Sequence, residues 1–316
     1  MNTQDIYNLA IDLGIKNDLR GEDRVRRLLV KNKKKKEELS PKELATFDDE
    51  SLTNPYSDSR ILNLANDKPI KKILVGIDIE SPELMFAQQR GDIDLVIAHH
   101  PEGIALADLS TVMHLQAEVL AQHGVPINIA ESVIQPRISE VNRGVSPINH
   151  QRSVDFAKLL QLNFMCLHTP ADNMSANFVT TAIAEKGEEL ETVGDLMEFL
   201  LEIPEYAAAL KLKAGPKIFA GSAERSLGKV VVTEFTGGTN GSKDIYERMA
   251  QYGIGTIVGM HMSEEHRKEA EKHHINVIIA GHMSSDSLGM NLLLDEIEKQ
   301  GIEVVPISGL IRIKRF

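Results

Sequence analysis

From residue 71 onward, short apolar runs alternate with longer amphipathic segments. Runs rich in valine, isoleucine and leucine, such as residues 73–77 and 95–98, are typical of buried strands. The segments between them, such as residues 109–123 and 288–299, carry apolar side chains at helical spacing and predict helices. Because strands and helices that alternate in this way form parallel βαβ units, we expect an α/β fold with mostly parallel strands.

The pattern divides the chain into three segments. Residues 1–70 are helical in pattern and rich in charge, and we expect them to form a helical leader. Residues 71–228 are expected to form a first α/β lobe with inserted helices, and residues 229–316 a second α/β lobe that completes the functional site. Two short segments carry their own predictions: residues 126–129 predict a strand, and residues 54–58 predict a turn or linker.

Composition and charge argue against one large class of partners. The chain of 316 residues is 42% hydrophobic and 26% charged, which is an ordinary globular composition. Its net charge of -11 argues against a general nucleic-acid binder, because such a protein needs a basic face. The lysine run at residues 33–36 is expected to be a solvated helix face, with an anionic partner as the alternative.

Cysteine usage and apolar content indicate the compartment. Cys166 is the only cysteine, so an intramolecular disulfide and a thiolate-rich zinc site are both excluded. No apolar run approaches the roughly 18 residues that a membrane span requires, and residues 1–20 show no signal-peptide pattern. We therefore expect a cytoplasmic protein that binds neither membranes nor nucleic acid.

Histidine and aspartate follow three of the predicted strands. The pairs are His99 and His100, His168 and Asp172, and His282 and Asp286. Because open α/β sheets bind ligands at the carboxyl ends of their strands, we expect these side chains to meet in one cleft. A single His-His pair is more often a surface or capping feature, and Asp172 or Asp286 alone suits a helix cap. Three such clusters together favour a metal site.

The donor types narrow the choice of metal. Imidazole and carboxylate without sulfur suit zinc, manganese, iron, cobalt or nickel. The donors suffice for two divalent ions, and paired ions about 3.5–4 Å apart lower the pKa of a shared water for hydrolysis. Glu102 is a candidate general base or a solvated loop acid. His168 is a candidate for orienting Asp172 or for touching a substrate.

The second half of the chain offers further candidates with open alternatives. His261, Glu265 and His266 either line the cleft or lie on a charged surface. Residues 237–242 read Gly-Gly-Thr-Asn-Gly-Ser and either form a plain turn or bind an anion through glycine amides. Because this segment lacks the lysine and hydroxyl pair of a P-loop, a nucleotide triphosphatase is not supported.

Four ordered motifs resemble the Nif-three-like family, also called GTP cyclohydrolase I type 2 homologues. They are residues 94–101 with His-His-Pro, residues 168–172 with His-Thr-Pro-x-Asp, residues 237–242, and residues 280–282 with an acid four positions on. The resemblance covers about residues 71–316 and leaves the leader outside. The chain has Asp286 where the family usually has glutamate, a longer helical segment at residues 133–162, and no evident Asp-Asn-x-Gly-Leu element near its start.

The resemblance implies two α/β lobes of the Nif-three-like type and a dinuclear metal site inside a ring-shaped homo-oligomer, often a hexamer. The metal ligands it implies are His99, His100, Asp172, His282 and Asp286. It also implies a metal-dependent hydrolase or cyclohydrolase that acts on a nucleotide or another small phosphorylated molecule. The alternative is a non-catalytic protein that buffers or delivers metal, or that acts through protein partners.

Overall fold

Two β-sheets form the framework of the protein, in a computed structural model that describes all of residues 1–316. The first sheet has the strand order β1-β4-β3-β2-β9 and the second has the order β5-β8-β7-β6. The first comprises β1 (Arg60–Asn63), β2 (Lys72–Gly76), β3 (Leu95–Ala98), β4 (Asn163–Cys166) and β9 (Glu303–Ile307). The second comprises β5 (Lys217–Ala220), β6 (Lys229–Val232), β7 (Ile254–Gly259) and β8 (Asn276–Ile279).

Most neighbouring strands are parallel. The pairs β2–β3, β2–β9, β3–β4, β6–β7 and β7–β8 are parallel. Only the edge strands β1 and β5 run antiparallel to their neighbours β4 and β8. This arrangement confirms the α/β fold with mostly parallel strands that the sequence pattern predicts.

Helices cover both faces of the first sheet, which explains why its central strands are continuous apolar runs. Successive residues of β2 point to opposite faces. Ile73 and Val75 pack with α1 (Thr3–Lys16) and α15 (His282–Glu298). Leu74 packs on the other face with α4 (Ser81–Arg90) and α9 (Arg152–Leu159).

The second sheet is covered in the same way by a larger set of helices. One face packs against α6 (Leu109–Val112), α7 (His114–Gln122), α8 (Ile127–Val145), α13 (Ile245–Gln251) and α14 (Glu264–Lys272). The other packs against α10 (Thr169–Lys186), α11 (Val193–Glu202) and α12 (Pro204–Lys211). Two short helices complete this part of the chain, α5 (Gly103–Ala107) before α6 and η2 (Gly187–Glu189) after α10.

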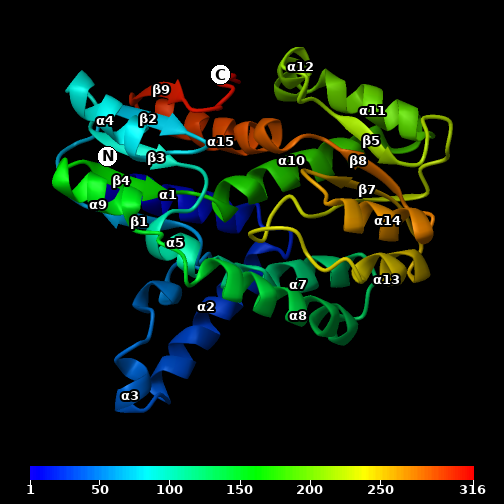
Figure 1. Cartoon of the computed structure of the whole chain (residues 1–316), viewed down its shortest axis with the longest axis horizontal. Helices are drawn as coiled ribbons and strands as arrows, with labels where there is room; N and C mark the ends of the chain where they lie inside the picture. The colour runs from blue at the N-terminus through cyan, green and yellow to red at the C-terminus, as the bar shows by residue number, and fades with distance from the viewer.

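α10 and α15 lie side by side in the middle of the molecule, between the two sheets (Figure 1). Their backbones come so close that a Cβ atom on Gly289 of α15 would overlap the carbonyl oxygen of Ala171 on α10. α15 contributes Leu288 to the core of the second sheet and Met290 to that of the first. These two helices therefore hold the sheets together, and both begin near the centre of the molecule.

The leader is helical as expected, but it is also part of the core. α1 buries Ile6, Ala10 and Ile11 against the first sheet. α2 (Glu22–Glu37) and α3 (Pro41–Leu44) project from the body as an arm (Figure 1), and η1 (Asp49–Leu52) follows them. α2 buries only Val25. The lysine run at the end of α2 is mostly exposed.

Residues 126–129 do not form the expected strand. They begin α8, with Pro126 directly before its first residue. Ala130, Ile134 and Ile138 follow at helical spacing and are buried in the core of the second sheet. This packing favours a helix over the short apolar run, and proline before the first turn suits a helix start.

The two sheets do not follow the expected segment boundaries at residues 70 and 228. β1 lies within the expected leader yet pairs with β4, and β5 precedes residue 229 yet pairs with β8. β9, from the last segment of the chain, returns to the first sheet beside β2. The physical reason is that the apolar pattern of a strand predicts its burial but not its neighbours.

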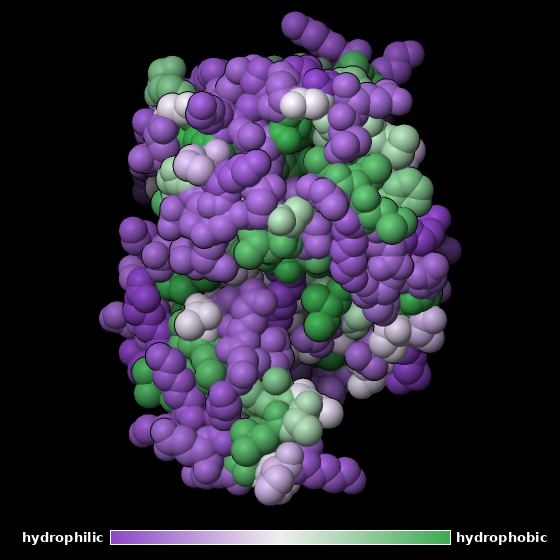
Figure 2. Space-filling view, turned by 90° about the vertical axis from the view of Figure 1, so that its left-hand side faces the viewer, coloured by the Kyte–Doolittle hydropathy of each residue, from purple (hydrophilic) through white to green (hydrophobic).

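The surface carries scattered apolar groups. Figure 2 views the molecule from the side of the first sheet and shows hydrophilic surface interrupted by separate hydrophobic patches. On the outer helices of this sheet, Met85 and Phe86 of α4 and Phe156 and Leu159 of α9 are exposed. None of the helices combines the length and the apolar composition that crossing a membrane requires.

Candidate metal centre

Six histidine and aspartate side chains meet where β3 and β4 end and where α10 and α15 begin. His99 and His100 directly follow β3. His168 precedes the first residue of α10, and Asp172 lies in its first turn. His282 is the first residue of α15, and Asp286 follows one turn later on the same face. The first two clusters meet because β3 and β4 are parallel neighbours whose carboxyl ends lie at the same edge of the first sheet. The third cluster follows β8 of the second sheet and reaches them because α15 packs against α10.

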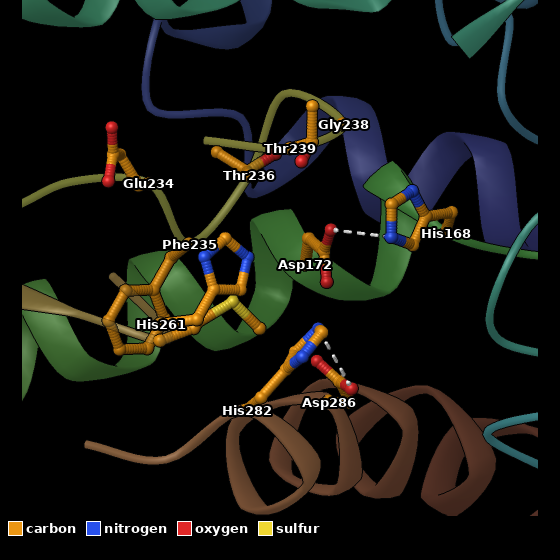
Figure 3. A pocket seen from close by; sticks show the side chains of 11 residues that line it. His168, Asp172, Glu234, Phe235, Thr236, Gly238, Thr239, His261, His282 and Asp286 are labelled. Carbon is orange, nitrogen blue, oxygen red and sulfur yellow. Dashed lines mark ion pairs between the residues drawn. The ribbon is translucent and has the colours of Figure 1, made fainter. Parts of the chain in front are cut away.

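Asp286 faces three histidines with its two oxygens. Its Oδ1 lies 3.6 Å from Nε2 of His99. Its Oδ2 lies 3.4 Å from Nε2 of His100 and 3.6 Å from Nε2 of His282. Figure 3 shows His282 and Asp286 side by side at the start of α15. One carboxylate therefore connects histidines from two different elements.

Asp172 occupies the equivalent position on α10. Its Oδ1 lies 3.4 Å from Nε2 of His99, and its Oδ2 lies 3.6 Å from Nε2 of His168. Ligand atoms around a tetrahedral zinc ion, with bonds of about 2.0–2.1 Å, lie about 3.4 Å from one another. The spacing in this cluster therefore matches neighbouring ligands of a common ion.

Several atoms of the cluster are buried without a partner. Nε2 of His99, Oδ1 of Asp172 and both carboxylate oxygens of Asp286 make no hydrogen bond. The three residues are 0%, 3% and 1% exposed, respectively. Burying such groups unpaired is costly, and one or more cations would satisfy all four atoms. Asp286 does not cap α15, because Gly281 holds the N-cap position and neither oxygen accepts a hydrogen bond.

The donor atoms form overlapping groups that fit metal ions. Within each group, ligand atoms lie within 4.8 Å of one another. The groups are His99, His100 and His168; His100, His282 and Asp286; and His99, Asp172 and Asp286. The structure thus brings together all five residues predicted as ligands and adds His168 to them. Nitrogen and oxygen donors without sulfur fit zinc, manganese, iron, cobalt or nickel.

Three of the histidines are held through their second ring nitrogen. Nδ1 of His99 lies 3.2 Å from the carbonyl oxygen of Leu167, which can only accept a hydrogen bond. Nδ1 of His100 lies 2.6 Å from Oδ1 of Asp78. With Nδ1 protonated, each ring directs Nε2 into the cluster, the arrangement that metal-binding histidines commonly adopt.

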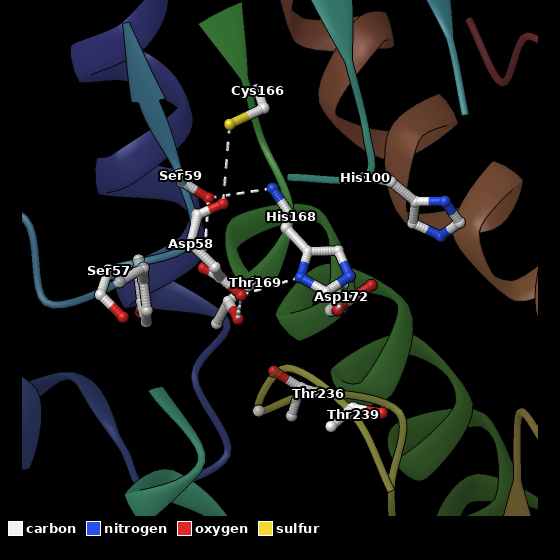
Figure 4. A network of polar contacts seen from close by, with 12 residues as sticks. Ser57, Asp58, Ser59, His100, Cys166, His168, Thr169, Asp172, Thr236 and Thr239 are labelled. Atoms are coloured by element: carbon white, nitrogen blue, oxygen red, sulfur yellow. Dashed lines mark hydrogen bonds and ion pairs between the residues drawn. The ribbon is translucent and has the colours of Figure 1, made fainter. Parts of the chain in front are cut away.

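Asp58 holds the third of these histidines, His168, and the sequence analysis did not identify Asp58 as part of the site. Its Oδ2 accepts hydrogen bonds from Nδ1 of His168 at 2.8 Å and from the Thr169 hydroxyl at 2.7 Å, as Figure 4 shows. The segment expected to be a turn or linker is in fact buried, with Tyr56 and Asp58 both 0% exposed. Asp78 was also missed, although it follows β2 as His100 follows β3 and could have been found by the same reasoning.

Without metal, the carboxylates of the cluster favour the protonated form of two of its histidines. Burial alone would lower the pKa of His99, but the carboxylates of Asp286 and Asp172 outweigh it and raise the pKa to about 10. Burial likewise opposes the charge on His100, yet Asp286 and Asp78 raise its pKa to about 9. Burial would raise the pKa of Asp286, but these histidines hold it well below its usual range. Protonated His99 and His100 would therefore offset the charge of Asp286 when no cation does.

The other predicted residues lie at different distances from the cluster. His261 lines the same cavity, and its ring lies 4.7 Å from that of His282. Glu102 directly precedes α5 and does not line the cavity, and burial raises its pKa to about 7. Glu265 is exposed and pairs with Lys243. His266 is buried, with Nε2 3.0 Å from the carbonyl oxygen of Gly241.

The Gly-rich loop between β6 and α13 reaches the cavity. Thr236, Gly238 and Thr239 line it (Figure 3), together with Glu234 and Phe235. α13 begins only at Ile245, so the loop does not lead directly into a helix. The structure places part of this segment, Gly238 and Thr239, at the cavity, and anion binding by its amides stays a prediction.

Comparison with known proteins agrees with this architecture. The fold and site define a two-sheet α/β protein with a buried cluster suited to metal. No protein-family profile and no curated protein matches the sequence. A solved structure of a NIF3 superfamily protein from Sphaerobacter thermophilus matches with a TM-score of 0.75 and 26% sequence identity, over 98% of this chain and 99% of that chain. This similarity over nearly the whole of both chains supports a NIF3-like family assignment.

Other solved structures share the fold. Reduced HcgD from Methanocaldococcus jannaschii matches with a TM-score of 0.50 and 14% identity, over 84% of this chain and 94% of that chain. The resemblance was expected to begin near residue 71, but the Sphaerobacter protein aligns with 98% of this chain. The leader is therefore part of the shared fold, as expected of a segment that contributes β1 and a buried α1.

Proposed function

We propose that the chain binds two divalent metal ions at the His/Asp cluster and acts as a metal-dependent hydrolase on a nucleotide or another small phosphorylated molecule. The observation that carries this proposal is the set of four buried, unpartnered atoms on His99, Asp172 and Asp286. Such a set is stable only when protons or cations compensate it. The metal is zinc, manganese, iron, cobalt or nickel, all of which accept this mixture of donors.

Asp286 is the reason for two ions rather than one. Its Oδ1 faces His99, whereas its Oδ2 faces His100 and His282. A carboxylate whose oxygens face separate histidines is suited to bridge two ions. We assign His99, His168 and Asp172 to one ion, and His100 and His282 to the other.

The residues of the chain fix the geometry of the site. Asp58, Asp78 and the carbonyl of Leu167 orient the imidazoles, and the loop at residues 236–239 borders the space left for a substrate. When bound, a pair of divalent ions supplies Lewis acidity and lowers the pKa of a water molecule. Glu102 as a general base stays a prediction, since it lies outside the cavity lining.

Metal analysis tests the binding half of the proposal. Purified protein loaded with zinc should contain about two ions per chain, because six donors exceed what one tetrahedral site needs. Replacing His99 and His100 together with alanine should remove more than half of the metal. His114→Ala, an exposed histidine on α7, is the matched control and should retain it. Loss of less than half the metal in the double variant would contradict the assignment.

Turnover separates the hydrolase from its alternative. A protein that only buffers or delivers metal would bind the ions equally well, so metal content alone does not distinguish the two. Metal-loaded protein should hydrolyse GTP or a related nucleotide, and His100→Ala should abolish that activity. Full metal occupancy without turnover of any nucleotide or phosphate ester tested would favour the non-catalytic role.

We also propose that the protein assembles with itself into a closed homohexamer in the cytoplasm. Closed symmetry is the usual arrangement of soluble oligomers. The apolar side chains of Phe156 and Leu159 on α9 are among those exposed on a single chain, which is consistent with a self-contact. Light scattering should give about six times the chain mass of 35.0 kDa, and a monomeric mass at micromolar concentration would contradict this.

A further inference from the structure

One peptide group of the Gly-rich loop is held in a fixed orientation at the edge of the metal cavity. The carbonyl oxygens of Gly237 and Thr239 both accept hydrogen bonds from Nε2 of Gln116, at 2.8 and 2.6 Å. Gln116 belongs to α7, is 7% exposed and does not line the cavity. It therefore holds these two carbonyl groups toward α7.

The N–H group of the same peptide faces the other way. In a trans peptide the carbonyl of one residue and the N–H of the next point in opposite directions, and the chain has no cis peptide bonds. Because the carbonyl of Gly237 faces Gln116, the N–H of Gly238 points away from α7. Gly238 lines the metal cavity, and its N–H donates to no acceptor in the protein.

Glycine is required at both positions of this peptide. Gly237 and Gly238 have φ values of 89° and 88°, a region that side chains disfavour. A Cβ atom on Gly237 would lie 2.8 Å from Cγ of Gln116. Glycine thus permits both the backbone conformation and the close approach that the hydrogen bond from Gln116 needs.

Two further groups at the cavity can donate to the same ligand. The hydroxyl of Thr239, which lines the cavity, has no partner in the protein. Nδ1 of His261 is buried and also makes no hydrogen bond. Glu234 does not take up these donors, because its two oxygens already accept hydrogen bonds, Oε1 from the N–H of Gly241 and Oε2 from the side chain of Asn240. Glu234 instead braces the loop.

We propose that the N–H of Gly238, held in place by Gln116, binds an anionic oxygen of the substrate's phosphoryl group beside the metal cluster. This rests on the proposed function, because the carboxylates of Asp172 and Asp286 repel an anion until divalent cations offset their charge. Oriented backbone amides are common donors to phosphate oxygens. Phosphate and metal therefore bind with positive coupling, each raising the affinity of the other.

The sequence allows this single amide to be observed directly. Residues 237 and 238 are the only Gly-Gly pair in the chain. Protein grown with glycine labelled at its carbonyl carbon with ¹³C and at its nitrogen with ¹⁵N gives one resonance in a spectrum that correlates an amide with the preceding carbonyl. Adding inorganic phosphate to zinc-loaded protein should shift this resonance saturably.

A pair of variants tests the role of Gln116. Gln116→Leu keeps about the size of the side chain but removes its hydrogen bonds to the two carbonyls, so that Gly237 keeps only the weaker bond of 3.2 Å from the N–H of Thr239. The substitution should weaken phosphate binding about tenfold, the effect of one charge-assisted hydrogen bond. Gln122→Leu, at an exposed position of the same helix, should leave phosphate affinity unchanged. Zinc content should be the same in both variants.

The outcomes separate this site from the proposed function. If two zinc ions bind but the resonance of Gly238 does not respond to phosphate, the anion site is overturned and the metal site stands. The same holds if phosphate affinity survives Gln116→Leu. If Gln116→Leu fails to fold, the titration of the unmodified protein decides alone. If no zinc binds, the proposed function fails and this site fails with it.

Discussion

Oδ2 of Asp58 accepts a hydrogen bond of 2.8 Å from Nδ1 of His168, and both residues are buried. Burial alone would raise the pKa of Asp58, but the hydrogen bonds from His168 and Thr169 and the attraction to the His168 imidazole hold that pKa below its usual range. The carboxylate therefore stays ionised and keeps the proton of the imidazole on Nδ1. Nε2 of His168 is left to face Asp172 and the cluster.

Replacing this carboxylate should weaken metal binding without removing any ligand. We expect Asp58→Asn to lower metal affinity about 10- to 100-fold, the usual effect of losing a group that orients a ligand histidine. Competition with a zinc chelator measures the affinity. Asp67→Asn, at an exposed position nine residues further along the chain, should bind metal as the unmodified protein does. An unchanged affinity in Asp58→Asn would show that His168 is oriented by other contacts or is not a ligand.

The close packing of α10 on α15 sets the separation of the two carboxylates. Gly289→Ala would place a methyl group against the carbonyl of Ala171, so the helices must separate. We expect a loss of stability of about 1–3 kcal/mol, typical of overpacking, together with weaker metal binding, because Asp172 and Asp286 move apart. Chemical denaturation and metal titration measure the two effects.

Gly144→Ala is the matched control for that prediction. Gly144 also lies within a helix, α8, but a Cβ atom there meets nothing within 4 Å. Alanine should stabilise this helix by up to about 1 kcal/mol, because it is the better helix former. If Gly289→Ala behaves like Gly144→Ala, then the contact with Ala171 does not limit the approach of the two helices.

The sequence predicts the cluster because its histidines and aspartates lie directly after, or within a few residues of, strands that can be recognised from the sequence. His99 and His168 follow neighbouring parallel strands, whose carboxyl ends lie together. His282 also follows a buried apolar run, but that run belongs to the second sheet, and the packing of α15 on α10 brings it to the other two. Asp58 carries no such signal. Asn-Pro-Tyr-Ser-Asp has the composition of a turn, and its burial depends on His168, which lies 110 positions further along the chain.

The sequence likewise could not predict which sheet β9 joins. Residues 303–307 read Glu-Val-Val-Pro-Ile, and nothing in this short run indicates which of the two sheets it joins. Their pairing with β2 follows from the path of α15, which ends beside the first sheet. Long-range packing also explains why residues 126–129 begin a helix rather than form a strand. Ile134 and Ile138, further along the same helix, are buried in the core of the second sheet.

Metal binding should release protons. In the metal-free protein the pKa values of His99 and His100 are about 10 and about 9, above their ordinary value of 6.5. Both imidazoles are therefore protonated at neutral pH and must lose a proton to bind metal. We expect release of up to two protons per chain at pH 7.5 and metal affinity that rises with pH. Calorimetry in buffers of different ionisation enthalpy measures the release, and zero release would contradict the ligand assignment.

The same shifts set the pH dependence of the metal-free fold. A histidine whose pKa is raised by folding stabilises the protein fully below pH 6.5, and that contribution is lost as pH rises through about 9 to 10. We expect the free energy of unfolding without metal to fall over this range. His99→Gln, which cannot take up the proton, should show a smaller fall, and an equal fall in both proteins would place the effect elsewhere.

Asp286 provides the sharpest test of a two-metal site. Its two oxygens face different histidines and accept no hydrogen bond. Asp286→Asn keeps the shape of the side chain but removes its charge, and we expect it to lose one metal ion per chain while the protein still folds. Without metal, the variant should also lose the stability that this charge gives through protonated His99 and His100. Asp286→Glu keeps the charge and should retain both ions. Elemental analysis of the two variants decides the matter: equal metal content in both would show that Asp286 does not bridge two ions.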